Sequence, residues 1–163
     1  MRSTRYDYAA GVARAACVAL AAGLCLPATA SAIAPGRADT AITQANIDTT
    51  ICTAGWSANR RPPSSFTASL KRRQLQTSGE HLLPSAFEED HLIPLSLGGA
   101  PADPANLWPQ PRAAADGWTA ARKDALETRL HRLVCAGEIP LAEAQHAIAT
   151  DWVAAYVRYG LGE

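Results

Sequence analysis

The chain has 163 residues, 48% of them hydrophobic, and equal numbers of basic and acidic side chains, 15 of each. This length predicts one folded domain. The balanced charge excludes a strongly basic protein that holds nucleic acid through its overall charge, although a local basic patch would suffice for an enzyme that acts on nucleic acid.

Residues 1–32 have the layout of a secretory signal peptide. Arginines near the start precede an uncharged run, residues 15–26, and small residues follow over 28–32. This order predicts cleavage after Ala32, with Ala30 as the second choice. Because the uncharged run is too short to span a bilayer, we expect a secreted or periplasmic protein with no stable membrane anchor after cleavage.

Two cysteines, Cys52 and Cys135, remain after that cleavage. An even number in an exported chain predicts one disulfide, Cys52–Cys135, and the alternative is a pair of buried thiols. A bridge across so long a loop stabilises a domain by roughly 4 kcal/mol in the chain-entropy account. A zinc site built on the cysteines is disfavoured, because the chain has no Cys-x-x-Cys pair.

The start of the mature chain differs in pattern from the rest. Residues 33–50 lack strong periodicity and are interpreted as a flexible N-terminal arm, so that the domain covers residues 51–163. Pro62-Pro63 predicts an extended segment. Ser64 or Ser65 can then cap a short helix over residues 66–75.

The central stretch, residues 87–109, reads as an irregular hairpin. Residues 87–97 form strand-like pieces broken at Pro94, Gly98-Gly99 marks a turn, and residues 106–109 form a second short strand. Alternation along a flat strand would place Asp90 and His91 on opposite sides. A strand end, bulge or turn near Pro94 would relax that constraint.

Two helices are expected after the hairpin, over residues 120–136 and 140–159, each with an apolar stripe. A second face of the first helix carries Asp124, Glu127 and His131, at spacings of three and four residues. The predicted fold class is therefore a small α+β domain with one disulfide.

The central residues carry a family likeness. Phe87–Leu95, the Gly98-Gly99 turn and Asn106-Leu107 resemble the HNH endonuclease motif, and the resemblance spans residues 87–124. It implies the ββα-metal fold, a hairpin followed by a helix, here with additional flanking helices. A wider likeness joins the mature chain to small exported bacterial proteins that are described only as HNH-like or uncharacterised. It includes Gly55-Trp56, Arg61–Pro63, Asn106–Pro109, Lys123-Asp124, Leu126-Glu127, Val134-Cys135, Ala144-Gln145 and Asp151-Trp152.

The resemblance assigns roles to three residues. It implies that His91 is the general base that activates water and that Asp90 holds a divalent metal ion, which could be Mg²⁺, Mn²⁺ or Zn²⁺. It also implies that Asn106 braces the hairpin loop and helps to orient the base. A positioned base and a metal ion are the two elements that phosphodiester hydrolysis requires.

The chain departs from the family pattern at the last metal ligand. No histidine or asparagine occurs between Trp108 and Lys123, where the helix of the motif supplies one. The available substitutes are Asp116, Asp124, Glu127 and His131. Of these, His131 is the preferred partner of Asp90 at the metal, with Asp124 and Glu127 behind it.

Two functions from different classes follow. The first is an exported, metal-dependent HNH-type endonuclease that hydrolyses DNA or RNA, with Arg61, Arg72 and Arg73 as phosphate contacts. The ordinary alternative for these arginines is surface charge. The second function is a non-catalytic exported domain that keeps the HNH fold and has a binding or envelope role.

Overall fold

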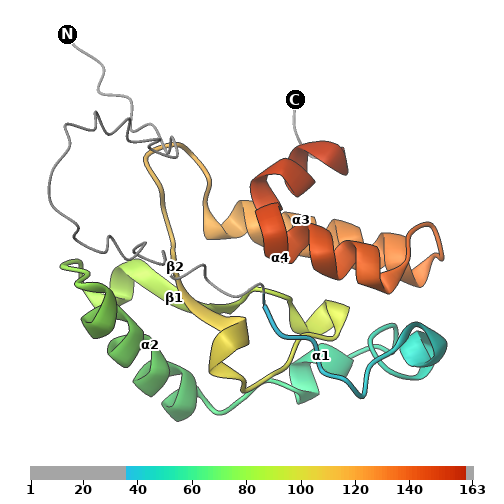
Figure 1. Ribbon diagram of the computed structural model, residues 1–163, viewed down its shortest axis with the longest axis horizontal. Helices are drawn as coiled ribbons and strands as arrows, with labels where there is room; N and C mark the ends of the chain where they lie inside the picture. Colours follow the sequence, from blue (N-terminus) through green and yellow to red (C-terminus); the bar gives the residue numbers. More distant parts are fainter. Residues whose placement is uncertain (1–35, 161–163) are drawn as a thin grey trace, which may run out of the picture. The chain divides into compact units, whose positions relative to one another are not determined.

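The computed structural model describes residues 36–160 (Figure 1). Its α-helices and β-strands are α1 (Trp56–Asn59), α2 (Ser64–Ser78), β1 (Phe87–His91), β2 (Leu107–Pro111), α3 (Ala120–Cys135) and α4 (Leu141–Arg158). Short 3₁₀ helices lie between them: η1 (Gln44–Thr49), η2 (Pro84–Ala86), η3 (Leu95–Leu97) and η4 (Pro104–Asn106). The predicted α+β class is confirmed. The predicted signal peptide lies outside the described residues.

The two strands form an antiparallel hairpin. Their register runs from Phe87 opposite Pro111 to His91 opposite Leu107. Strand β1 ends at His91, and such a strand end near Pro94 is one of the three features expected to relax the Asp90-His91 alternation. The prediction that strand-like structure continues to residue 97 is wrong for the residues after His91. Pro94 is followed by a 3₁₀ helix and not by further strand pairing.

The hydrogen bonds of the hairpin show which residues of β1 direct their N–H and C=O away from β2. Leu92 N donates to Asn106 O at 2.8 Å, and Arg112 N donates to Ala86 O at 2.9 Å. The N–H and C=O of even-numbered residues in β1 therefore face β2, and those of odd-numbered residues face outward. Two outward carbonyls are taken by lysines: Lys71 Nζ of α2 donates to Phe87 O at 2.9 Å, and Lys123 Nζ of α3 donates to His91 O at 2.7 Å. The two helices are thus tied to the same edge of one strand.

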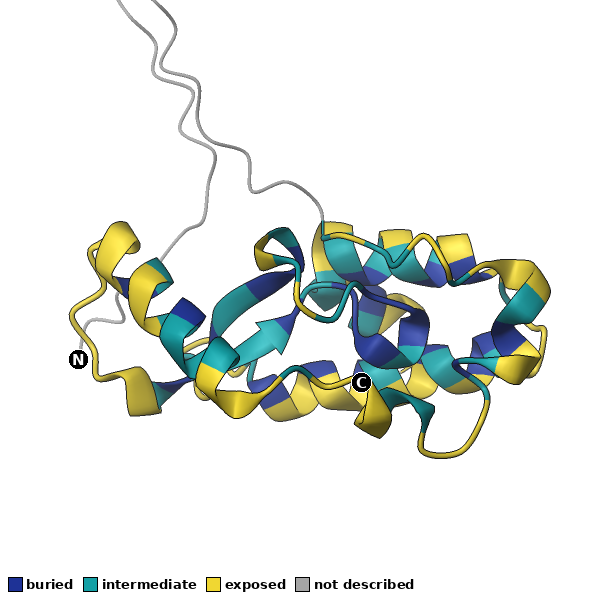
Figure 2. Ribbon diagram, turned by 90° about the horizontal axis from the view of Figure 1, so that it is seen from below, coloured by how far each residue is buried: buried dark blue, intermediate teal, exposed yellow. Residues whose placement is uncertain are grey.

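The hydrophobic core lies where α3 and α4 pack together with η1 and η3. Figure 2 colours the buried residues dark blue. The predicted stripe of α3 is buried throughout, and it consists of Leu126, Leu130, Leu133 and Val134. Ala144 and Ile148 of α4 pack in the same core. Burial of each large aliphatic side chain stabilises the fold by about 1.5–3 kcal/mol, so this helix pair gives α3 a fixed position beside the hairpin.

The segment expected as a flexible arm is packed from residue 36 on, which corrects that prediction for residues 36–50. Ala38 forms a β-bridge with Gly99, and Asp39 N donates to Gly98 O at 2.8 Å. Ile47 is 8% exposed and belongs to the core. One β-bridge and a few contacts with distant residues hold this segment in place. Such contacts leave no periodic pattern in the sequence, so the sequence did not predict them.

The predicted disulfide is confirmed. Cys52 and Cys135 are bonded, with their Cα atoms 5.7 Å apart. The bridge fixes the segment after η1 to the last residue of α3.

Helix α4 differs from the single uninterrupted helix that was expected. Asp151 has φ −155° and ψ 87°, and its Oδ1 accepts a hydrogen bond from Ala154 N at 2.9 Å. It therefore caps a second helical segment within α4. None of the helices in residues 36–160 has the length and apolar character needed to cross a membrane.

Candidate functional site

A polar cavity of about 360 Å³ lies along the outward edge of β1. Four consecutive residues of that strand, Glu88–His91, line it, and consecutive side chains alternate between the faces of a strand. The cavity therefore lies at the strand edge and not over one face. The remaining lining comes from three other segments: Ser57 and Arg61 near α1, Pro94–Ser96, and Asp124 and Glu127 of α3.

The loop beside this cavity is closed by Asn106, which is fully buried. Its Oδ1 accepts from Ile93 N at 2.9 Å, and its Nδ2 donates to Ile93 O and to Ala100 O, each at 3.0 Å. A side chain at Gly99 would not fit, because its Cβ would lie 1.8 Å from Ile93 O. The residue that the motif assigns to bracing the loop thus makes three hydrogen bonds across it.

His91 is held in one orientation by the far side of that loop. Its Nε2 lies 3.0 Å from Pro101 O. A carbonyl only accepts hydrogen bonds, so Nε2 carries the proton and the neutral ring has its lone pair on Nδ1. Burial lowers the pKa of His91, although the Pro101 hydrogen bond and the charge of Asp90 oppose this shift. The imidazole is therefore neutral near pH 7 and able to accept a proton.

A buried lysine organises the carboxylates of the cavity. Lys123 is 1% exposed, and its Nζ lies 2.6 Å from Asp90 Oδ2, 2.6 Å from Glu127 Oε1 and 2.7 Å from His91 O. All three donors of the ammonium are used. Burial disfavours its charge, but Glu127 and Asp90 outweigh that effect and raise the pKa of Lys123.

Lys123 is not among the predicted site residues, although the sequence contains a signal for it. The residue lies three positions before Leu126 and seven before Leu130, which places it on the buried stripe of α3. A lysine on such a stripe needs acidic partners, because an unpaired buried charge is strongly destabilising. Glu127, one turn further along the helix, is one of those partners.

The carboxylates around Lys123 carry more negative charge than it neutralises. Burial raises the pKa of Asp124 and of Glu88, and the charge of Asp90 raises both further. Burial also raises the pKa of Glu127, to about 7, against the effect of Lys123. Crowded carboxylates with raised pKa values are the electrostatic environment that attracts a cation.

Glu89 is the least satisfied of these groups. Neither of its carboxylate oxygens has a hydrogen-bond partner within residues 36–160. Burial raises its pKa to about 7, although Lys71 opposes the shift. The carboxyl of Glu89 is therefore partly protonated near neutral pH.

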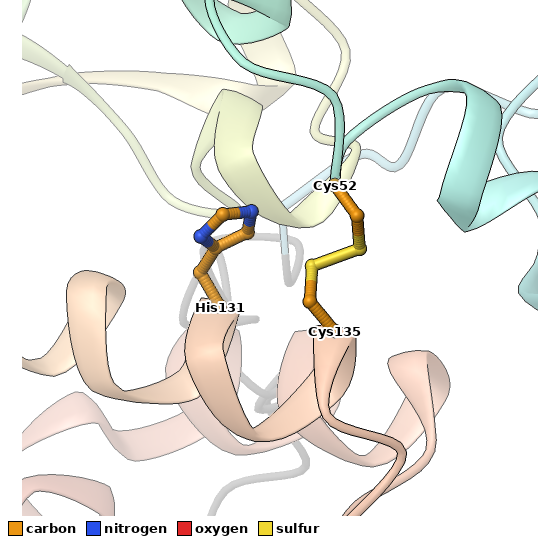
Figure 3. A group of neighbouring side chains, drawn as sticks. All are labelled: Cys52, His131 and Cys135. Atoms are coloured by element: carbon orange, nitrogen blue, oxygen red, sulfur yellow. A yellow bond between two sulfur atoms is a disulfide. The ribbon is translucent and has the colours of Figure 1, made fainter.

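His131, the preferred second metal ligand, is not among the described residues that line the cavity. Its Nε2 lies 2.9 Å from Ile51 O, and the ring stands beside the disulfide (Figure 3). Ligand atoms of Cys52, His131 and Cys135 lie within 4.8 Å of one another, so the group could hold a metal ion. The two sulfurs are bonded to each other, however, and thiolates are the form that binds metal.

The structure brings Asp124 and Glu127 to Asp90, and these were the substitutes ranked behind His131. Asp116 is exposed and accepts a hydrogen bond from Trp118 N at 3.1 Å. The carboxylate oxygens that could bind a metal ion together with Asp90 therefore come from Asp124 and Glu127, in the first turns of α3.

Of the three arginines expected to contact phosphate, Arg61 lines the cavity. Arg72 and Arg73 are exposed on α2, and Arg73 Nη1 donates to Ser69 Oγ at 2.9 Å. They are not among the lining residues that the structure describes. One of the three expected contacts is thus placed at the candidate site.

Comparisons with protein-family models, with curated proteins and with solved structures found no match for this chain. The likeness of residues 87–124 to the HNH motif therefore stays a prediction. The geometry of the cavity is therefore the basis for proposing a function.

Proposed function

We propose that this protein is an exported phosphodiester hydrolase, an HNH-type endonuclease that uses His91 as its general base. One observation carries the proposal: the hydrogen bond between His91 Nε2 and Pro101 O leaves Nδ1 as the proton acceptor of a neutral ring in an acidic cavity. A base positioned in this way contributes roughly 10²- to 10⁴-fold to a hydrolysis rate.

The residues of the cavity fit one divalent ion. Asp90 and Asp124 offer carboxylate oxygens, which suit hard ions such as Mg²⁺ and Mn²⁺ better than Zn²⁺. The two carboxylates lie close enough for the charge of Asp90 to raise the pKa of Asp124, and this crowding of negative charge supplies the attraction for a cation. Such an ion would stabilise negative charge on the phosphate and the leaving oxygen.

The protein's own residues activate the water and bind the phosphate. His91 takes a proton from water at Nδ1, and the Pro101 carbonyl stabilises the imidazolium that forms by accepting from Nε2. Asn106 holds the loop that carries this carbonyl. Arg61, which lines the cavity, offers a guanidinium to the phosphate.

The substrate class is DNA or RNA outside the cytoplasm. The disulfide supports an oxidising compartment, the secreted or periplasmic location expected from the sequence. Five carboxylates line the cavity, and they would repel a polyanion in the absence of a divalent ion. The nuclease is therefore proposed as metal-dependent.

A second candidate function is a non-catalytic exported domain with the same fold and a binding or envelope role. The observation that favours it is the contact between Lys123 and Asp90, in which an ammonium already neutralises the expected metal ligand.

The test uses the oxidised chain without residues 1–32, incubated with plasmid DNA and with RNA. Mg²⁺, Mn²⁺ and Zn²⁺ are supplied separately, and chelator is added in a parallel set. We expect cleavage that requires a divalent ion and that His91→Ala abolishes. His81→Ala is the matched control, because His81 is exposed.

Two results would reject the nuclease. One is no cleavage of either substrate with any of the ions, at high concentration of protein shown to be folded by circular dichroism. The other is cleavage that His91→Ala leaves intact. The first result would favour the non-catalytic domain.

A further inference from the structure

We propose that the ammonium of Lys123 is the resident cation of the acidic cavity. It occupies the position between Asp90 and Glu127 that a divalent ion would otherwise take, and it confines a divalent ion to the outer carboxylates. The inference deepens the proposed function, on which it rests for the role of the cavity, because it names the residue that decides where a divalent ion binds.

The contacts of Lys123 are those of a cation in an oxygen cage. Two carboxylate oxygens and one backbone carbonyl lie 2.6–2.7 Å from Nζ. Carboxylate and carbonyl oxygens are also the atoms that Ca²⁺ and Mg²⁺ bind. The side chain is 1% exposed, so its charge is inside the cage and not at its mouth.

The charges explain why a second cation still has a place. The single positive charge of Lys123 faces two carboxylates, Asp90 and Glu127, and cannot neutralise both. The carboxylate of Asp124 adds further negative charge. Asp124 follows Lys123 in the chain and lines the cavity beside Asp90. The outer position therefore consists of Asp90 and Asp124, with Glu127 held by the lysine.

Lys71 provides a matched comparison on the same strand edge. Its Nζ donates to Phe87 O at 2.9 Å, as Lys123 donates to His91 O. No ion pair between Lys71 and a carboxylate is found within residues 36–160. Lys71→Ala thus removes a lysine–carbonyl hydrogen bond and a positive charge near Glu89, but it leaves the oxygen atoms that surround Lys123 Nζ in place.

The experiment removes the resident cation and measures Ca²⁺ binding by calorimetric titration of the oxidised protein. We expect Lys123→Ala to bind one Ca²⁺ at least about tenfold more tightly than the unaltered protein, because the vacated cage keeps two carboxylates and a carbonyl. Lys71→Ala and Lys123→Arg should bind as the unaltered protein does. Lys123→Ala/Glu127→Gln should lose the gain.

Thermal unfolding supplies a second readout. A ligand that binds the folded state raises the melting temperature, so Ca²⁺ should raise that of Lys123→Ala by several degrees more than that of Lys71→Ala. Lys123→Gln guards against a variant that does not fold, because its amide retains a donor without the charge. A Lys123→Ala chain that folds only with Ca²⁺ present would support the inference.

The inference is overturned if neither Lys123→Ala nor Lys123→Gln binds Ca²⁺ more tightly than the unaltered protein. It is also overturned if Lys123→Arg shows the same gain as Lys123→Ala. Neither readout uses hydrolysis. A protein without nuclease activity can therefore still pass this test, and an active nuclease can fail it.

Discussion

His91 and His131 are held in the same way and stand in different surroundings. Each has its Nε2 against a backbone carbonyl, Pro101 O at 3.0 Å and Ile51 O at 2.9 Å. In the neutral form of either ring, the lone pair therefore lies on Nδ1. His91 lies among carboxylates at a cavity, whereas His131 lies beside a disulfide. A fixed tautomer is therefore not enough to make a catalytic site, because the groups around the ring decide its chemistry.

The largest effect is expected from removing the disulfide on the His131 side. Cys52→Ser/Cys135→Ser should lower the free energy of unfolding by about 2–5 kcal/mol, because a long loop is released. Chemical denaturation measures the change. Nucleic-acid cleavage per folded molecule should stay the same. Loss of cleavage in fully folded protein would show that the disulfide side of the molecule contributes to the activity.

Asn106→Ala should have the next largest effect, on the His91 side. It leaves the buried N–H and C=O of Ile93 without their partner, which costs about 2–4 kcal/mol. Cleavage should fall as well, because the loop that carries Pro101 loosens. Asn59→Ala, at an exposed residue, should change neither quantity. An equal loss of stability without loss of cleavage would show that the brace does not orient the base.

Glu89→Gln tests the electrostatics of the cavity on the His91 side. The pKa of Glu89 is about 7 in the folded protein, against an ordinary value of 4.5. The protonated carboxyl therefore contributes stability that is fully present below pH 4.5 and is lost as the pH rises through 7. Because the group is partly open to solvent, Glu89→Gln should stabilise the protein by about 1–2 kcal/mol near pH 8 and little near pH 5. Denaturation curves at both pH values check this, and an equal effect at both would contradict it.

The smallest effect is expected from His131→Gln. It removes one hydrogen bond to Ile51 O, worth about 1 kcal/mol. Thermal unfolding should register that loss, while cleavage and Ca²⁺ binding stay within about twofold of the unaltered protein. Loss of divalent binding in this variant would restore His131 as a metal ligand.

The sequence predicted the parts of this fold that leave a periodic or turn signal. The apolar stripe of α3, the Gly98-Gly99 turn and the hairpin were all expected, because buried faces and tight turns restrict residue types locally. The disulfide followed from cysteine number and export.

The remaining features depend on contacts between distant segments. Lys123 meets Asp90 across 33 positions of the chain, and His131 meets Ile51 across 80. Helical spacing placed Asp124, Glu127 and His131 on one face but could not say which turn of α3 would lie at the hairpin. The core that α3 shares with Ile93 and Leu97, and the contacts of Lys123 with β1, decide that.

The lysine-bound carbonyls of β1 have a consequence for how copies of this protein meet. Phe87 O and His91 O are occupied, and on the other edge Gln74 Nε2 donates to Leu107 O at 2.8 Å. Pro109 and Pro111 stand at outward-facing positions of β2 and have no N–H to offer. These contacts and prolines reduce the number of donors and acceptors that each edge offers to a further strand. Edge-to-edge pairing between copies of the hairpin is therefore hindered at these positions.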